Sequence, residues 1–410
     1  MLKIFFLLAF ALLCNLWGLF IGKVLDDNSL EPISKALIIG TEQDYYCDGN
    51  GTFLIDSNET EFHIKAIGYR PQTFTKNPRG RVVIKLKPIK VKALYLSFWG
   101  ASNNSKTLQN ILDIIEKSEA NAIVMDVKNE YGSTSFYTGF KQANSYGAHE
   151  NRTNRNIKKF MSIMKEKDIY TIARIVTFKD ELQAVNNPDY AIRSNDENQS
   201  IWRNHDKMAW VDPFDERSHE YAIRIAEEAA KVGFDEINFD YIRFPAQKNL
   251  LLKKPNTQKN RVEAIEKFLA KAKTRLHPYG VFISVDTYGN ICWTDDDNGI
   301  GQMVSSLAKY ADYLAPMLYP SGFACGSFYF DYPAEYPYEV IYRSVKTIQD
   351  RIASNRVRPW LQYFKDYGKY KLPYRKIAIQ AQIRASEDVG ANGWMMWSPS
   401  SKYHLEYLRK

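Results

Sequence analysis

Apolar segments rich in β-forming residues alternate with amphipathic segments over most of the chain. Eight short apolar runs are strand candidates, at residues 91–98, 122–127, 170–178, 236–244, 281–288, 313–319, 357–364 and 393–397. Segments with helical spacing of apolar residues lie between them, at 108–117, 157–167, 218–232, 262–276, 340–352 and 374–389. Near-continuous apolar strands separated by helices are typical of a parallel sheet. Eight such units predict an α/β fold, a (β/α)8 TIM barrel, over residues 91–410, with an inserted loop after Phe178.

Residues 22–90 have a different pattern. Short β-type runs at 22–27, 35–39, 52–55 and 62–69 are separated by Gly, Asn and Asp, which favours a small β-sandwich. The strings Gly22-Lys-Val-Leu-Asp, Gly49-Asn-Gly-Thr-Phe and Lys65-Ala-Ile-Gly-Tyr resemble the carboxypeptidase regulatory-like domain. That resemblance implies a non-catalytic spacer or a module beside a carbohydrate site. The basic, turn-rich segment 71–88 is expected to join this domain to the barrel.

The first 21 residues carry one Lys and then an apolar run that only Asn15 interrupts before Ile21. This pattern predicts a signal peptide, or an uncleaved membrane anchor, and therefore export to the periplasm or cell envelope. Exported cysteines meet oxidising conditions. Cys292 and Cys325 follow consecutive predicted strands, and the sequence leaves open whether they form a disulfide or stay free thiols.

Composition narrows the function classes. Hydrophobic residues make up 45% and charged residues 25%, as in an ordinary globular protein. Lys and Arg total 55 against 47 Asp and Glu, and this net charge of +8 comes without a nucleic-acid-binding motif, so no nucleic-acid partner is expected. The 6 His include no pair at metal-ligand spacing. We therefore expect no metal and no cofactor, and this argues against a metal-dependent polysaccharide deacetylase.

Two carboxylates stand out at predicted strand ends, where TIM-barrel active sites lie. Asp240 and Asp286 come from neighbouring strands at similar positions, and neighbouring strands are about 5 Å apart. Retaining glycosidases need two carboxyl groups at about that separation. We predict Asp240 as the nucleophile and Asp286 as the acid/base.

Further polar and aromatic residues gather at the same rim. The aromatic rings of Tyr241 and Trp360 could stack on sugars, and Arg243 could hold a carboxylate in its ionised form. The alternatives are structural: Asp240 could pair with Arg243 or Arg174, Arg174 could pair with Asp126, and Trp397 could belong to the packing. The predicted substrate-binding residues are Asp126, Lys128, Arg174, Arg243, Tyr288, Tyr319, Gln362 and Trp397.

Four motifs carry a family resemblance over three quarters of the chain. They are Gly233-Phe-Asp-Glu-Ile-Asn-Phe-Asp-Tyr-Ile-Arg-Phe-Pro, Ala311-Asp-Tyr-Leu-Ala-Pro-Met-Leu-Tyr-Pro, Arg358-Pro-Trp-Leu-Gln and Gly393-Trp-Met-Met-Trp. Together they resemble the glycoside hydrolase family with a DUF4015-type barrel. The resemblance implies a TIM barrel related to amylase-like hydrolases, in which the Asp of strand four, here Asp240, is the nucleophile. The amylase-like acid on strand five is Glu, whereas this chain offers Asp286.

The leading hypothesis is an exported glycoside hydrolase that cleaves an envelope or extracellular polysaccharide by a retaining mechanism. The alternative is a carbohydrate-binding protein that uses a hydrolase-like barrel without turnover, because a fold does not dictate a function. The expected partner is a polysaccharide or cell-wall glycan, with membrane anchoring through residues 1–21 as an open possibility.

Overall fold

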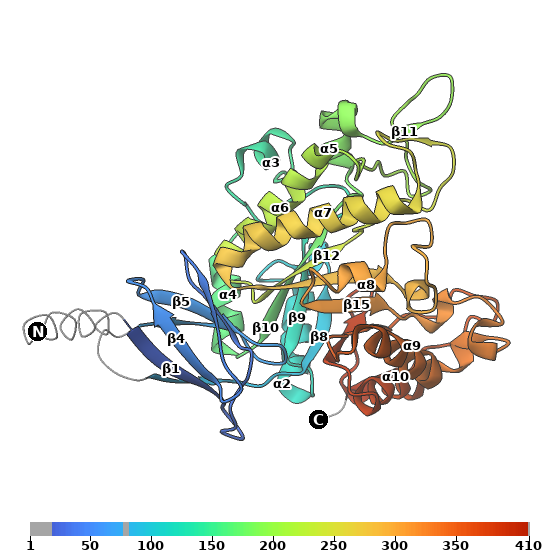
Figure 1. Ribbon diagram of the computed structural model, residues 1–410. Helices are drawn as coiled ribbons and strands as arrows, with labels where there is room; N and C mark the ends of the chain where they lie inside the picture. The colour runs from blue at the N-terminus through green and yellow to red at the C-terminus, as the bar shows by residue number, and fades with distance from the viewer. Residues whose placement is uncertain (1–18, 77–81, 409–410) are drawn as a thin grey trace, which may run out of the picture. The chain divides into compact units, whose positions relative to one another are not determined.

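The computed structural model describes residues 19–76 and 82–408. The chain divides into two compact units. The first contains the residues up to Ile89 together with His277–Val281, and the second contains Lys90–Leu276 and Phe282–Lys410. Figure 1 shows the β-rich N-terminal part in blue and the helices and strands of the larger unit from cyan to red.

The second unit is a closed barrel of eight parallel strands. Chain order is also the order around the barrel, and β17 pairs with β8 to close it. Buried side chains fill both faces of the central strands, which explains their continuous apolar runs. The prediction of a (β/α)8 barrel is confirmed. Its strands are β8 (Val91–Leu96), β9 (Ala122–Lys128), β10 (Tyr170–Val176), β12 (Glu236–Asp240), β14 (Phe282–Tyr288), β15 (Tyr313–Met317), β16 (Trp360–Gln362) and β17 (Gly393–Trp397).

Amphipathic helices follow the strands and cover the barrel. Helix α2 begins after Ser105, whose side-chain hydroxyl accepts a hydrogen bond from the backbone N–H of Leu108 and so caps the helix. The inner face of the helix buries Leu108, Ile111 and Leu112. The long helices agree with the predicted ones to within a few residues: α2 (Lys106–Lys117), α4 (Ile157–Glu166), α6 (Glu216–Lys231), α7 (Gln258–Leu276), α9 (Pro337–Ile352) and α10 (Lys376–Asp388). Three shorter helices are α3 (Lys141–Ser145), α5 (Glu181–Asn186) and α8 (Val304–Leu307). The insertion expected after Phe178 includes β11 (Arg193–Ser194), which pairs with β13 (Leu250–Leu251).

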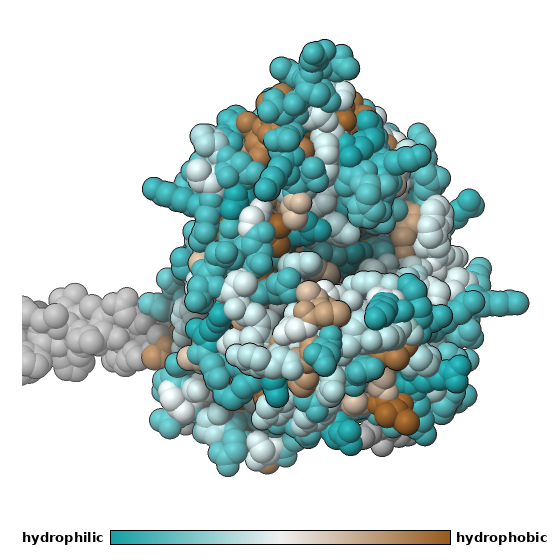
Figure 2. All heavy atoms as spheres, turned by 90° about the vertical axis from the view of Figure 1, so that its right-hand side faces the viewer, coloured by the Kyte–Doolittle hydropathy of each residue, from teal (hydrophilic) through white to brown (hydrophobic). Residues whose placement is uncertain are grey.

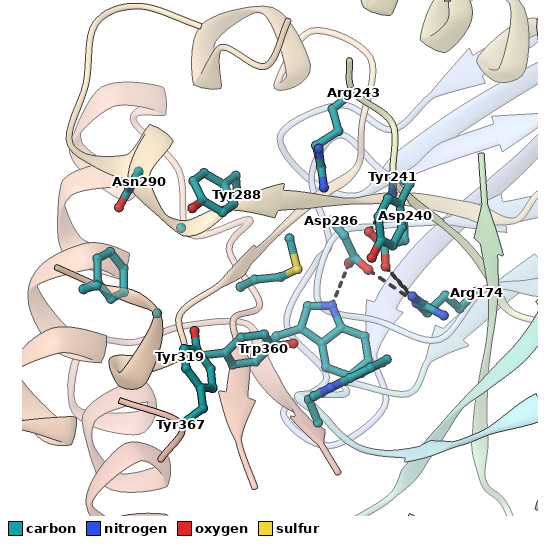
Figure 3. A pocket seen from close by; sticks show the side chains of 15 residues that line it. Arg174, Asp240, Tyr241, Arg243, Asp286, Tyr288, Asn290, Tyr319, Trp360 and Tyr367 are labelled. Carbon is teal, nitrogen blue, oxygen red and sulfur yellow. Dashed lines mark hydrogen bonds and ion pairs between the residues drawn. The ribbon is translucent and has the colours of Figure 1, made fainter. Parts of the chain in front are cut away.

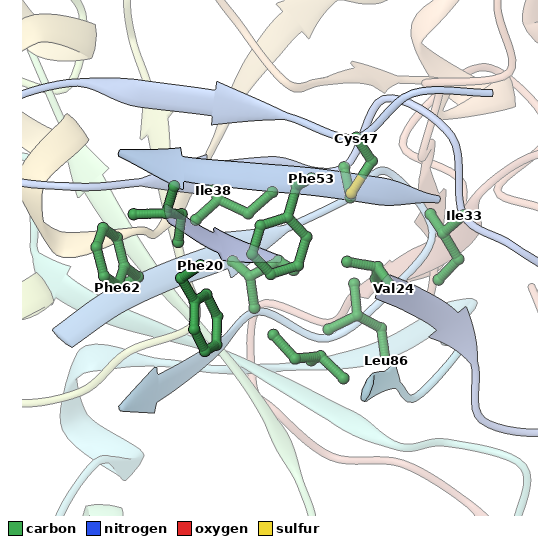
Figure 4. Packing of buried hydrophobic residues seen from close by; sticks show 12 residues of the cluster. Phe20, Val24, Ile33, Ile38, Cys47, Phe53, Phe62 and Leu86 are labelled. Carbon is green, nitrogen blue, oxygen red and sulfur yellow. The ribbon is translucent and has the colours of Figure 1, made fainter. Parts of the chain in front are cut away.

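The N-terminal unit consists of two sheets around one apolar core. The sheet orders are β4-β1-β7 and β3-β2-β5-β6. Side chains from both sheets, including Val24, Ile38, Phe53, Phe62 and Leu86, form a single buried cluster (Figure 4). The strands are β1 (Leu19–Asp26), β2 (Leu37–Ile39), β3 (Asp44–Tyr46), β4 (Thr52–Asp56), β5 (Glu61–Lys65), β6 (Gln72–Thr75) and β7 (Val82–Leu86).

The expected join at 71–88 is wrong, because this segment contains β6 and β7. β7 runs parallel to β1 inside the domain, with Gly22 opposite Val82. Ile84 and Leu86 are buried, whereas Val83 and Lys85 point outward. This alternation is that of a half-buried strand, and the surrounding Pro and basic residues hid it.

The predicted leader, residues 1–21, lies outside the described residues up to position 18. Leu19–Asp26 is strand β1, so the last three residues of that segment belong to the β domain. Among the described residues, no helix has the length and apolar character to cross a membrane. Cys47, Cys292 and Cys325 are free thiols, so Cys292 and Cys325 are not joined.

Candidate active site

A cavity of about 310 Å³ lies at the carboxyl ends of the barrel strands (Figure 3). Seven of the ten predicted site residues line it: Arg174, Asp240, Arg243, Asp286, Tyr288, Tyr319 and Trp397. Tyr241 and Trp360, expected as sugar-stacking rings, line it too.

Strand register brings Asp240 and Asp286 together. β12 and β14 pair with Asn238 opposite Ser284, so Asp240 and Asp286, each two residues farther on, lie level and face the same side. The inward side chains of Asn238 and Ser284 are hydrogen-bonded at 3.0 Å just below them. The two acids therefore enter the cavity from adjacent strands.

Arg174 on β10 is the centre of the charged cluster. Its Nη1 donates to Oδ1 of Asp126 at 2.5 Å, and its Nε donates to Oδ2 of Asp240 at 3.0 Å. Nη2 also donates to Oδ2 of Asp240. The same Nε lies 3.9 Å from Oδ2 of Asp286. Two of the three ion pairs left open by the sequence, Arg174 with Asp126 and Arg174 with Asp240, are therefore present.

The two catalytic candidates share Arg174 Nε as a neighbour, and this limits their separation. The distances from that nitrogen to Oδ2 of Asp240 and to Oδ2 of Asp286 are 3.0 and 3.9 Å. The two oxygens can be no farther apart than the sum of these distances. That limit lies at the lower edge of the range of inverting pairs, about 6.5–9.5 Å, and includes the shorter separation of retaining pairs.

Asp286 is the carboxyl group of the pair whose pKa is raised. Burial raises its pKa well above the usual value, and the charge of Asp240 raises it further, against the opposing effects of Arg174, Asn238 and Trp360. Asn238 Nδ2 and Trp360 Nε1 donate to Oδ1 at 2.8 and 2.6 Å. Oδ2 is then the oxygen placed to carry the proton.

Asp240 lies in a different setting. Besides the two Arg174 donors, the backbone N–H of Tyr241 donates to its Oδ1 at 2.5 Å. Three N–H groups aimed at one carboxylate satisfy a negative charge well. Tyr241 has a φ of 50°, in the left-handed region, and such a conformation costs a non-glycine residue roughly 1–2 kcal/mol.

Aromatic side chains form the walls of the cavity. The ring of Trp397 lies 4.1 Å from that of Tyr95 and 5.5 Å, edge to face, from that of Trp360. The guanidinium of Arg174 lies over the Trp397 ring at 5.0 Å. Tyr288 is 43% exposed at the mouth, so its ring is accessible to a ligand. Trp397 thus packs against its neighbours and still presents a face to the cavity.

Three predicted substrate-binding residues do not line the cavity. Asp126 lies behind Arg174 and accepts a hydrogen bond from Tyr95 at 2.5 Å, and burial raises its pKa. Lys128 is fully buried, pairs with Asp180 at 2.8 Å and donates to the carbonyl of Val176.

Gln362 is the third of these residues and is also fully buried. Its Oε1 accepts a hydrogen bond from the backbone N–H of Ser321 at 3.1 Å, and its Nε2 donates one to the Ser321 hydroxyl at 2.7 Å. All three side chains bond to neighbouring residues of the barrel, and none of them lines the cavity.

Arg243 lines the cavity but does not hold Asp240. Among the described residues its hydrogen bond goes to the carbonyl of Phe244 at 3.2 Å, and no ion pair with Asp240 forms. Arg174, and not Arg243, forms the ion pair with Asp240.

Sequence reasoning did not single out several lining residues. Asn290 follows β14, Phe323 follows β15 and Tyr367 follows β16, all on connecting segments. Their only signal was a position within some ten residues of a strand end, which many residues share. Asn238 lies within the strand-four motif, but only the strand register brings its side chain into a hydrogen bond with Asp286.

The described residues contain no group of three or more His, Cys, Asp or Glu that could hold a metal ion.

The face of the molecule shown in Figure 2 is mostly hydrophilic, with small separate hydrophobic patches and a hollow near its centre. Aromatic rings beside hydroxyl-binding polar groups, as in the cavity, suit a sugar ligand.

The chain matches one family model and is similar to several solved structures. Residues 93–403 match the model of the DUF4015 family, described as "Putative glycosyl hydrolase domain". The glycoside hydrolase domain of PgaB (BpsB) from Bordetella bronchiseptica is similar in structure, with 12% identity, a TM-score of 0.52 and coverage of 76% of this chain and 94% of that one. This likeness supports the barrel fold.

Two further structures are similar over part or most of the chain. A hypothetical protein from Ruminiclostridium thermocellum ATCC 27405 has 34% identity and a TM-score of 0.42, covering 47% of this chain and 96% of its own. The spore cortex-lytic enzyme SleL of Bacillus megaterium QM B1551 has 13% identity and a TM-score of 0.46, covering 82% of this chain and 75% of its own. The search of curated proteins found no match.

Proposed function

This chain belongs to the DUF4015 family of glycosyl hydrolase domains, and from that premise we propose that it cleaves the glycosidic bonds of an envelope or extracellular polysaccharide by a retaining mechanism. The observation that carries the mechanism is the pair of unlike carboxyl groups. Asp286 holds a proton through burial, and Asp240 receives three N–H donors. Two neighbouring acids with different protonation are what acid-assisted glycoside cleavage needs.

In the first step, Asp286 donates its proton from Oδ2 to the glycosidic oxygen while the bond from that oxygen to the anomeric carbon breaks. The Asp240 carboxylate attacks the anomeric carbon and forms a covalent glycosyl ester. The negative charge of Asp240 stabilises the positive charge that develops on the sugar ring in the transition state.

In the second step, Asp286 acts as a base. Once Asp240 is esterified, its charge no longer raises the pKa of Asp286, so Asp286 holds its proton less strongly. The ionised Asp286 takes a proton from a water molecule, which attacks the anomeric carbon and releases Asp240. The aromatic walls of Trp360 and Trp397 hold the ring in place during both steps.

The proposed location rests on the apolar run before Ile21, which has the pattern of an export signal or anchor. Such a signal would carry the enzyme out of the cytoplasm, where an envelope or extracellular polysaccharide is the available substrate. Secretion of a fusion that carries residues 1–21 ahead of a reporter tests this part independently of the chemistry.

The experiment for the catalytic pair compares wild type, Asp240→Asn and Asp297→Asn on a panel of envelope glycans, including peptidoglycan strands. Asp297 is a matched control because it is also a buried Asp held by an Arg, with Oδ2 at 2.6 Å from Arg261 Nε, but it does not line the cavity. We expect wild type and Asp297→Asn to release new reducing ends. Asp240→Asn should lower the rate about 10³-fold or more, because the nucleophile is lost.

Proton NMR of the first product formed reports the anomer, and retention is expected. An inverted product would overturn the nucleophile role of Asp240, as would an unchanged rate in Asp240→Asn. Glycan binding by wild type without release of reducing ends would favour the non-catalytic carbohydrate-binding protein.

A further inference from the structure

Arg243 is a cation in the cavity that forms no ion pair within the described residues. It lies three residues after Asp240, and Figure 3 shows its side chain reaching from the end of β12 toward the cavity. Of its five N–H donors, one is used within the described residues, by the carbonyl of Phe244 at 3.2 Å. No ion pair with a described carboxylate is formed.

The position of the Arg243 guanidinium is fixed by two aromatic rings. It lies 5.2 Å from the ring centre of Trp210 and 5.1 Å from that of Tyr241. Trp210 is itself buried, and Tyr241 is anchored through its N–H to Asp240. Stacking holds the plane of a guanidinium without using its N–H groups, which therefore stay available to a ligand.

The other cation of the cavity is in the opposite situation. Arg174 binds Asp126 and Asp240 through three of its nitrogens. The two acids that line the cavity also have hydrogen-bond donors. Asp240 accepts hydrogen bonds from Arg174 and from the Tyr241 backbone. Asp286 accepts them from Asn238 and Trp360. Arg243 alone among the charged groups lining the cavity lacks a partner of opposite charge in the described chain. Burial lowers the pKa of Arg243, against the opposing electrostatic effects of Tyr241, Asp240 and Tyr288.

We propose that Arg243 binds an anionic substituent of the sugar, so that the substrate is an acidic polysaccharide. The inference rests on the proposed function, since it names the substrate class of the same cavity. The forked N–H groups of a guanidinium match the two oxygens of a carboxylate, and they also donate hydrogen bonds to a sulfate ester. Partial burial strengthens the pair, because the cavity screens charge less than bulk water does.

The test is binding of matched glycan pairs to the full chain. One arm uses oligogalacturonides, hyaluronan oligosaccharides and peptidoglycan strands, each beside its carboxyl-reduced counterpart. The other arm uses carrageenan oligosaccharides beside desulfated ones. The proteins are wild type, Arg243→Gln and the control Arg343→Gln. Arg343 makes the same two kinds of contact, over the Phe330 ring at 5.0 Å and to the carbonyl of Phe328 at 3.2 Å, but it does not line the cavity.

Wild type and Arg343→Gln should bind the anionic member of at least one pair roughly 10- to 100-fold more tightly than its neutral counterpart. Arg243→Gln should lose that preference and keep its affinity for the neutral member. The arm that shows the preference identifies the anion as carboxylate or sulfate.

The proposal is overturned if wild type has no preference for any anionic member, whether it binds the pairs equally or binds none of them. It is also overturned if Arg243→Gln keeps the preference. Asp240-dependent cleavage of neutral glycans without such a preference would leave the proposed function standing and this inference refuted. Arg243-dependent binding of an anionic glycan without cleavage would support this inference and refute the proposed hydrolase function.

Discussion

At the scale of residues, one guanidinium organises three acids from three strands. Arg174 contacts Asp126 on β9, Asp240 on β12 and Asp286 on β14. Three ionised carboxylates around one cation would leave two uncompensated negative charges in a buried cluster, which is costly. Holding a proton on Asp286 removes one of them. The chemical difference between Asp240 and Asp286 thus follows from the charge balance of the whole cluster.

We predict that Asp286→Asn is more stable than wild type at neutral pH. The pKa of Asp286 is raised in the folded state above 3.8, so folding favours its protonated form. Near pH 4 and below, this costs wild type little. As the pH rises from there toward the folded pKa, the unfolded chain loses the proton first and wild type loses stability. The difference should grow by at most about 1.4 kcal/mol per pH unit, measured by thermal unfolding between about pH 4 and 8.

The control for this prediction has the opposite sign. The pKa of Asp297 is lowered despite its burial, by hydrogen bonds from Arg261 and the backbone of Gly301 and Gly299. Asp297→Asn should therefore be less stable than wild type at neutral pH, with the difference shrinking as the pH falls through the folded pKa. A stability gap for Asp286→Asn that does not change with pH would contradict its role as the proton carrier.

At the scale of elements, closure of the barrel depends on one glycine. β17 pairs with β8 through Gly393 opposite Val91. Gly393 has a φ of 88°, and a Cβ at this position would lie 1.9 Å from the carbonyl oxygen of Val91. The close approach of the two backbones allows only a residue without a side chain.

We predict that Gly393→Ala costs roughly 4 kcal/mol or more in the free energy of unfolding, because a backbone clash adds to the unfavourable φ. Gly390→Ala is the matched control. Gly390 lies just beyond α10 with a φ of 70°, and a Cβ there would meet no atom within 4 Å, so only the backbone strain of about 1 kcal/mol applies. Urea unfolding of both variants measures the two costs. Equal costs would mean that the approach of β17 to β8 does not limit closure.

At the scale of the whole molecule, the two units have separate hydrophobic cores. The N-terminal cluster is drawn entirely from residues 20–86, and its largest members are phenylalanines such as Phe53 and Phe62. In the barrel, Phe268 of α7 packs edge to face on Phe178 and Phe239. Cores that share no residues can unfold as separate units.

We predict that calorimetry of the full chain shows two transitions. Phe53→Ala should lower one of them, with a loss of about 3–5 kcal/mol, and leave glycan cleavage unchanged below that transition. Phe268→Ala should lower the other, and activity should be lost with it. A single transition that moves with both substitutions, accompanied by loss of activity in Phe53→Ala, would show instead that the two cores unfold together.

The strands, the helices and the position of Asp240 at a strand end were predictable from the sequence because local patterns encode them. Lys128 was not, although it also lies at a strand end. The register between β9 and β10 shifts next to it, with Arg174 opposite Asp126 but Ile175 opposite Lys128. Such an irregularity changes which way a side chain points, and nothing in the local pattern reveals it.

The sequence by itself determined the barrel, the β domain and the strand ends where chemistry gathers, since apolar periodicity and turn residues act over a few positions. Only the tertiary structure decided how protons and charges are divided at those ends. Burial and the charge of Asp240 on the neighbouring strand raise the pKa of Asp286, although Asn238 and Trp360 donate hydrogen bonds that act in the opposite direction. Arg243 forms no ion pair among the described residues, where the Asp240 carboxylate is bound by Arg174. Burial and converging donors depend on residues far apart in the chain, and folding alone brings them together.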